Sequence, residues 1–371
     1  MTRKSLLALL LVSCMLLSGC SLVLKDQAVD NQLPIIEVNG QIIDKMTFNS
    51  VYEYNVYMEE YYNSMLASMF GSASQVDANA ILEDTISSYV TSIVTGNKAA
   101  ELGFDKFTAE EEAELDAQAQ AEYDENLTMI QDMYFAGSEL TGEELAAEVA
   151  AYAARNGLTL DESKRSVRSA KIEERLIASV TDLVADVDDA EIQALLDSKI
   201  AEEKEDYASS LSVWGASHNN GNDTYYTPAG YRTVRALEIA KPAEGDAAEA
   251  KAQADALHAR ITAGEGIDTL GETVNTYAVC ESSTDLDAAL VEAAMRIPAA
   301  GNISPVIETE GGYVIIEYVE DIAEHAATLE EVREQLHDEA LTNKKNAAYT
   351  AAVAQWESEA DVKIYRENLS L

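Results

Sequence analysis

The sequence predicts an α+β fold in which a small α/β domain interrupts a mostly helical body. Three observations support this prediction. Apolar residues recur at steps of three and four over most of the 371 residues, which is typical of amphipathic helices. β-branched residues crowd two short runs on either side of Glu310-Gly311-Gly312, a pattern that indicates a hairpin. The stretch 215–230 is rich in Gly, Asn and Asp and almost free of aliphatic residues, so it marks a boundary.

Residues 34–214 are predicted to form a lobe of helices, which follows a short strand–turn around Asn39-Gly40. Apolar residues of the helix after this turn form a stripe: Val51, Tyr54, Met58, Tyr61, Met65 and Met69. Met and Tyr side chains adapt to many partners, so four of them are candidate substrate-binding residues: Tyr54, Met58, Tyr61 and Met65. The alternative is that this stripe is simply buried core.

Further helices are indicated by capping-box patterns at Thr108–Glu111 and Thr141–Glu144. A third such pattern, Thr328–Glu331, opens a long C-terminal helix. Because this helix is too long and amphipathic to stand alone, we expect residues 323–371 to pack back on the N-terminal lobe. Residues 215–228 are the predicted linker to the α/β domain.

The composition indicates a folded and strongly acidic protein. Apolar residues make up 47% of the chain, and its length suffices for two or three domains. With 67 acidic and 25 basic residues, the formal net charge is −42. Such a charge repels nucleic acid, so we expect no nucleic-acid partner. A well-solvated surface explains the same charge, which by itself identifies no partner.

The N-terminus has the pattern of a targeting signal. Residues 1–19 are basic at Arg3-Lys4 and apolar from Leu6 to Leu17, a stretch that is short for a membrane span. The Leu-Ser-Gly that precedes Cys20 resembles the bacterial lipobox, in which the cysteine is acylated and becomes the mature N-terminus. We therefore expect a lipoprotein signal peptide, lipidation of Cys20 and a polar tether over residues 20–33. An ordinary cleaved signal is the alternative.

Cysteine and histidine usage argues against disulfides and metals. Of three cysteines only Cys280 lies beyond the signal and the lipobox, so no intrachain disulfide can form in the mature chain. The four histidines are scattered, and no Cys/His cluster has metal-ligand spacing. The sequence therefore predicts neither a metal site nor another cofactor.

Five motifs in the second half of the chain resemble those of a known family. In order they are Val234-Arg235-Ala236-x-x-Ile239, Leu257-x-x-Ile261-x-x-Gly264, Ala293-Ala294-Met295-x-Ile297, Gly301-Asn302-Ile303-Ser304-Pro305-Val306 and Gly312-Tyr313-x-Ile315-Ile316. This order resembles a parvulin-type peptidyl-prolyl isomerase domain, which would occupy residues 229–322. Segments around Val38-Asn39-Gly40, residues 99–104 and residues 184–196 resemble the flanks of SurA- and PrsA-type foldases. The mature chain as a whole is similar to a PrsA-type foldase lipoprotein, which implies a chaperone lobe around the inserted domain.

The resemblance also implies a site, and the site departs from the family pattern. The family is understood to use an apolar proline pocket and a polar cluster with two histidines. Glu238 and Val314 stand at the two histidine positions, and Cys280 falls near a polar pocket position. Met295 and Ile297 match positions of the pocket wall, although core packing explains them equally well. A carboxylate and a valine cannot replace two neutral imidazoles, so we expect little or no isomerase activity.

The resemblance implies a chaperone or foldase, anchored through Cys20 on the extracytoplasmic face of a bacterial cell membrane. Its partners would be unfolded or secreted polypeptides, with the membrane bound through lipid and with a homodimer as one option. The first alternative is an active parvulin-type isomerase whose pocket is aligned differently. The second is a solute-binding or structural lipoprotein, although repeated βα units are not evident.

Overall fold

The computed structural model describes residues 26–71, 75–241, 247–270 and 273–369. The predicted signal peptide and Cys20 lie outside the described residues. None of the described helices combines the length and apolar character of a membrane span.

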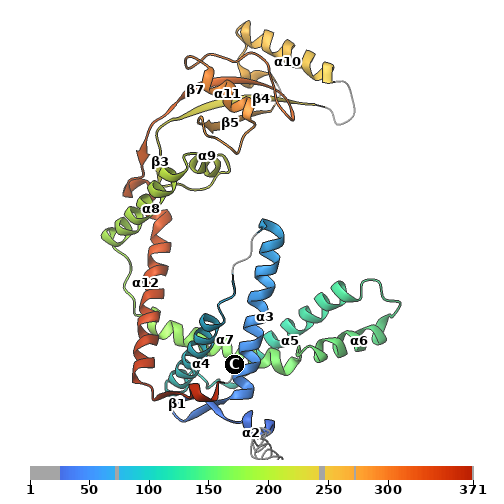
Figure 1. Cartoon of the computed structure of the whole chain (residues 1–371), viewed down its shortest axis with the longest axis vertical. Helices are drawn as coiled ribbons and strands as arrows, with labels where there is room; N and C mark the ends of the chain where they lie inside the picture. The colour runs from blue at the N-terminus through green and yellow to red at the C-terminus, as the bar shows by residue number, and fades with distance from the viewer. Residues whose placement is uncertain (1–25, 72–74, 242–246, 271–272, 370–371) are drawn as a thin grey trace, which may run out of the picture. The chain divides into compact units, whose positions relative to one another are not determined.

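The chain divides into two compact units (Figure 1). The first unit comprises Met1–Val184 and Lys345–Leu371, and the second comprises Ala185–Lys344. The first is a helical body with one small sheet, and the second holds a four-stranded sheet with helices on it. The predicted α+β class, a helical body with an inserted α/β domain, is confirmed.

The first unit contains mostly helices, whose bounds follow the predicted periodicity. They are α2 (Gln27–Asp30), α3 (Lys45–Phe70), α4 (Ala78–Glu101), α5 (Ala109–Tyr134), α6 (Gly142–Arg155) and α7 (Leu160–Thr181). Thr108 caps α5 in a capping box with Glu111. Thr141 also precedes a helix, but its side chain makes no cap hydrogen bond.

A three-stranded antiparallel sheet ties the two ends of the chain together within the first unit. β1 (Pro34–Val38) and β2 (Gln41–Asp44) form the predicted hairpin, and β9 (Val362–Ile364) pairs with the other edge of β1. Ile35, Ile36 and Phe48 are fully buried, and Trp356 of the C-terminal helix packs against their cluster. The end of α12 and β9 therefore pack within the first unit, whereas the amphipathic start of α12 packs on α8 in the second unit.

The second unit surrounds an antiparallel sheet of order β5-β4-β7-β6. The strands are β4 (Tyr231–Ala240), β5 (Val274–Val279), β6 (Ile307–Glu308) and β7 (Gly312–Ile322). Two helices, α10 (Ala247–Thr262) and α11 (Ala288–Arg296), pack against opposite faces of this sheet. A second, two-stranded sheet pairs β3 (Tyr226–Thr227) with β8 (His325–Ala326). The remaining helices are α8 (Asp189–Ser209), α9 (Ser212–Asn219) and α12 (Leu329–Glu359), which continues into the first unit.

Residues 215–228 differ from the predicted linker. Helix α9 and strand β3 occupy much of this stretch, and Trp214 is only 1% exposed. The Gly215 N–H donates to the Tyr231 hydroxyl over 2.9 Å, and a Cβ at Gly215 would lie 2.6 Å from the Tyr231 ring. This polar stretch is therefore fixed by buried aromatic residues on either side of it, Trp214 and Tyr231. Gly215 allows the close approach of the Tyr231 ring because it has no side chain.

The boundary between the units also differs from the predicted end of the lobe at residue 214. The compact division precedes α8, because Ile192 and Leu196 of α8 pack against Val332 and Leu336 of α12 within the second unit. Long-range packing of this kind has no signature in local composition.

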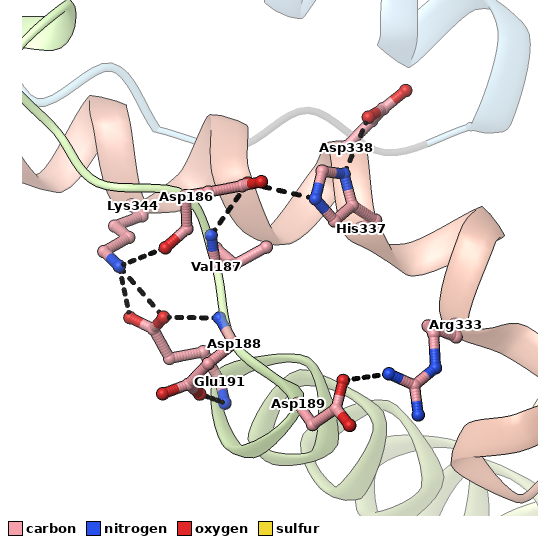
Figure 2. A network of polar contacts seen from close by, with 9 residues as sticks. All are labelled: Asp186, Val187, Asp188, Asp189, Glu191, Arg333, His337, Asp338 and Lys344. Atoms are coloured by element: carbon pink, nitrogen blue, oxygen red, sulfur yellow. Dashed lines mark hydrogen bonds and ion pairs between the residues drawn. The ribbon is translucent and has the colours of Figure 1, made fainter.

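Polar contacts reinforce the packing of α8 on α12 (Figure 2). Lys344 donates to the carbonyl oxygen of Asp186 over 3.1 Å and to the Glu191 carboxylate over 2.9 Å. The two ring nitrogens of His337 lie 3.0 Å from carboxylate oxygens of Asp186 and Asp338. Hydrogen bonding to Asp338 and the nearby charge of Asp186 raise the pKa of His337 above its ordinary value.

Replacing His337 with Gln is expected to lower the stability of the second unit in a pH-dependent way. A folded-state pKa above the unfolded value of about 6.5 means that the contribution is full below that pH and disappears as pH rises through the folded-state pKa. Thermal unfolding of both proteins between about pH 5.5 and pH 8.5 measures this, with His258→Gln on α10 as the control. A difference in melting temperature between His337→Gln and the parent chain that stays constant with pH would contradict a raised pKa of His337 in the folded state.

Candidate functional site

The pairing of β4 with β7 brings two predicted site residues together. Glu238 and Val314 are direct cross-strand partners, so their side chains lie on the same face of the sheet. This is the face that packs against α11, where Val314 is 1% exposed and belongs to the core. Glu238 lies at the exposed margin of the same face.

A polar cluster forms around Glu238. Its Oε1 accepts hydrogen bonds from the Tyr277 hydroxyl over 2.8 Å and from Asn275 Nδ2 over 3.2 Å. Burial and the hydrogen bond to Glu238 raise the pKa of Tyr277 to about 12. The phenol therefore stays protonated and donates to the carboxylate at neutral pH. Sequence reasoning missed Asn275 and Tyr277, although their spacing of two in a strand places them on one face.

This cluster limits the chemistry that the face can perform. Rotation about a prolyl bond removes amide resonance, so a catalyst must hold the twisted form better than the planar forms. The hydroxyl of Tyr277 and the amide of Asn275 already donate to Glu238. An ionised carboxylate only accepts hydrogen bonds, and Val314 offers no polar group. The arrangement suits binding of a peptide N–H better than stabilisation of a twisted amide.

An apolar cavity of about 370 Å³ lies in the same domain, and its lining includes none of Glu238, Asn275 and Tyr277. Its apolar lining comes from α11 and from the chain leading into β6: Ala289, Ala293, Ile297, Pro298, Ile303, Pro305 and Ile307. Ile307 pairs with Val314 in the sheet, so the cavity lies on the β6 side of β7, whereas Glu238 lies on β4 at the other side of β7. Arg296 and Glu292 form an ion pair among its lining residues. The cavity could accommodate an apolar side chain or a proline ring.

The two predicted wall residues divide between core and a different cavity. Ile297 is 4% exposed and packs in the core, although it also lines the 370 Å³ cavity. Met295 is half-buried and lines a separate cavity of about 390 Å³ with Glu281 and Ser283. The structure therefore does not bring Met295 and Ile297 into a single wall.

Cys280 lies in a different cluster from Glu238 and Val314. It is 1% exposed and packs with Trp214 and Tyr231. Burial raises the pKa of its thiol, but hydrogen bonding with Ser282, Tyr231 and Ser283 outweighs this effect and lowers it. The structure does not place Cys280 in the polar cluster, because Cys280 continues the side of β5 that carries Ala278, away from Tyr277.

The Met/Tyr stripe of α3 is largely exposed, so the alternative that it is buried core does not hold. Tyr54, Tyr61 and Met65 are 60%, 54% and 41% exposed, and Met58 is half-buried. Further exposed apolar side chains lie among them, namely Tyr57, Tyr62, Leu66 and Met69.

The reason for this exposure is the length of α3. Its first turns pack against α4, where Tyr52 donates to the carbonyl of Ala78 over 3.3 Å and Asn55 to Thr85 over 3.1 Å. Ala78 is the first residue of α4, and α3 continues to Phe70 beyond these contacts. At 1.5 Å per residue, residues 57–69 add about 20 Å of helix with an exposed apolar face.

Comparison with known families assigns the sheet-containing part of the chain. Residues 221–334 match the family model described as the PPIC-type PPIASE domain. The matched segment contains the whole β5-β4-β7-β6 sheet and the Glu238 cluster. This part of the chain is a parvulin-type domain, and the resemblance of its motifs is confirmed. No curated protein sequence matches the chain.

Several solved structures resemble the chain over most of its length. One, from a study of SurA-like chaperones of Campylobacter jejuni, is 10% identical, covers 90% of this chain and 99% of its own, and has a TM-score of 0.33. PrsA from Bacillus subtilis is 14% identical, with coverages of 92% and 99% and a TM-score of 0.22. The foldase protein PrsA from Lactococcus lactis is 18% identical, with coverages of 90% and 95% and a TM-score of 0.20.

Replacing Gly312 with Ala is expected to destabilise the parvulin-type domain by at least about 1 kcal/mol. A Cβ at Gly312 would overlap the carbonyl oxygen of Ile239 and lie 3.0 Å from the Cα of Ala240, so β7 would have to move away from β4. Gly311→Ala is the matched control, since a Cβ there meets nothing within 4 Å. Thermal unfolding of the two variants compares them, and equal stabilities would show that the close approach does not constrain the sheet.

Proposed function

We propose that the chain is an extracytoplasmic chaperone, or foldase, that binds unfolded secreted polypeptides and has weak or no prolyl isomerase activity. The exposed Met/Tyr face of α3 is the observation that carries this proposal. Exposed apolar surface of this size on one helix is uncommon in a soluble protein unless it binds something. The parvulin-type domain supports a role in polypeptide folding.

The side chains of this face suit partners without a fixed sequence. Met and Tyr provide flexible or amphipathic contact area, which can adapt to different apolar segments. Glu59 and Glu60 lie exposed among them and keep the helix soluble.

We further propose that lipid on Cys20 anchors the chain at the outer face of the cell membrane. The support is the lipobox-like Leu-Ser-Gly-Cys20 after a basic and apolar leader. Incorporation of a labelled fatty acid at Cys20 in cells tests this anchoring. Recovery of the chain without any label would overturn it.

Truncating the α3 face is expected to impair suppression of aggregation. The variant combines Tyr54→Ala, Tyr61→Ala and Met65→Ala, which keep helix propensity and remove exposed side chains only. If clients cover these side chains at roughly 1 kcal/mol each, client affinity falls by at least about tenfold. Light scattering of an unfolded client with increasing amounts of each protein measures the effect.

The matched control removes exposed apolar side chains elsewhere in the first unit, through Leu102→Ala, Leu158→Ala and Leu183→Ala. This control should suppress aggregation as well as the parent chain does. Equal activity of the α3 variant and the control would refute the assignment of the α3 face.

An active isomerase is the second candidate, because the parvulin-type domain contains an apolar cavity of about 370 Å³ that could hold a proline ring. Because Tyr277 and Asn275 already donate hydrogen bonds to Glu238, we expect the chain not to accelerate cis–trans exchange of a proline peptide. NMR of the peptide measures the exchange rate. Ile303→Ser, which alters the lining of the cavity, should then change nothing. Clear catalysis by the parent chain that Ile303→Ser abolishes would favour the isomerase over a purely binding role.

A further inference from the structure

A second exposed apolar surface lies on the hairpin of α5 and α6. Met129, Met133 and Tyr134 near the end of α5 are 51%, 63% and 59% exposed. Met129 and Met133 are one helical turn apart and share a face. The neighbouring face of α5 packs on α6, where Ile130 is buried against Val149 and the Tyr134 ring lies 5.0 Å from the Tyr152 ring.

Three carboxylates near the start of α5 form ion pairs with α7, and in the described part of the chain the carboxylates near Met129 and Met133 do not. Near its start, carboxylates pair with cations of α7, in the pairs Glu111–Arg175, Glu112–Arg168, Asp116–Arg168 and Asp116–Lys164. Glu125, Asp132 and Glu139, which flank the exposed apolar residues, take part in no ion pair within the described residues. Negative charge therefore remains uncompensated where the apolar surface is exposed.

The sequence of the hairpin sharpens this contrast. Between Lys106 and Arg155 it contains thirteen acidic residues and no Lys or Arg. Arg155 itself is engaged, since its guanidinium lies 3.2 Å from Glu148 and 5.9 Å from the centre of the Tyr152 ring. The hairpin thus has no free cation of its own near Met129 and Met133 to neutralise a partner's negative charge.

We propose that this hairpin surface, formed by Met129, Met133 and Tyr134 with Glu125, Asp132 and Glu139, binds cationic amphipathic segments of unfolded polypeptides. The inference rests on the chaperone function proposed above and names the client chemistry. Apolar client residues cover the methionines, while lysines or arginines of the client meet the carboxylates and the Tyr134 ring. Acidic segments of equal hydrophobicity are repelled, so the surface selects by charge.

The test uses the full chain and two labelled peptides with identical Leu and Phe positions. One peptide has Lys at every polar position and the other has Glu. Fluorescence anisotropy at low salt should show the Lys peptide binding at least about tenfold more tightly, with the preference shrinking near about 0.5 M NaCl. Because these groups are exposed, the variants should fold, which circular dichroism checks.

Two variants and one control locate the effect. The double variant Met129→Ser, Met133→Ser should bind the Lys peptide more weakly. The triple variant Glu125→Gln, Asp132→Asn, Glu139→Gln should lose most of the preference for the Lys peptide over the Glu peptide. The control neutralises three exposed carboxylates of the second unit, through Glu205→Gln, Glu330→Gln and Glu334→Gln, and should keep the preference.

The outcomes separate this inference from the proposed function. Equal affinity for both peptides, or a preference that survives neutralisation of the hairpin, overturns the charge-selective surface. Aggregation suppression that depends on the α3 face would leave the chaperone function standing in either case. Loss of the preference in the control as well as in the hairpin variant also overturns the assignment, since the net negative charge of the whole chain would then explain the preference.

Discussion

The antiparallel register of β4 against β7 is the constraint on which the parvulin-type domain depends. The backbones approach so closely at Gly312 that a Cβ there would overlap Ile239. A slip of one residue would move every side chain of β7 to the opposite face of the sheet. The observed register places Val314 and Ile316 against α11, and Tyr313 and Ile315 against α10. Both cores of the domain follow from this one pairing.

The same register decides what the site can do. It aligns Glu238 with Val314, so a carboxylate and an apolar side chain meet where the resemblance implies two imidazoles. The polar groups that gather there, Tyr277 and Asn275, are committed to the carboxylate. The parvulin-type sheet thus carries on this face a carboxylate whose Oε1 accepts two hydrogen bonds.

In the first unit, exposed apolar surface arises where a helix extends past its partner. The start of α3 is buried against α4 and β1, and its later turns have no such cover among the described elements. On α5 the contrast is electrostatic as well, because cations of α7 pair with Glu111, Glu112 and Asp116 near its beginning, and the carboxylates near its end have no such pairs within the described residues. Apolar contact provides affinity and uncompensated charge provides selectivity, and the proposed surface on the α5–α6 hairpin combines both.

The α+β class, the hairpin at Gly311-Gly312 and most helices could be predicted from the sequence, because periodicity, turn residues and caps act locally. The order of the motifs also identified the parvulin-type domain. Only the tertiary structure decided that the α3 stripe is exposed, since helical periodicity shows which face is apolar and not what covers it. It likewise decided that Cys280 joins Trp214 rather than Glu238, and that Asn275 and Tyr277 complete the polar cluster. These outcomes depend on contacts between residues far apart in the chain, and no local pattern records them.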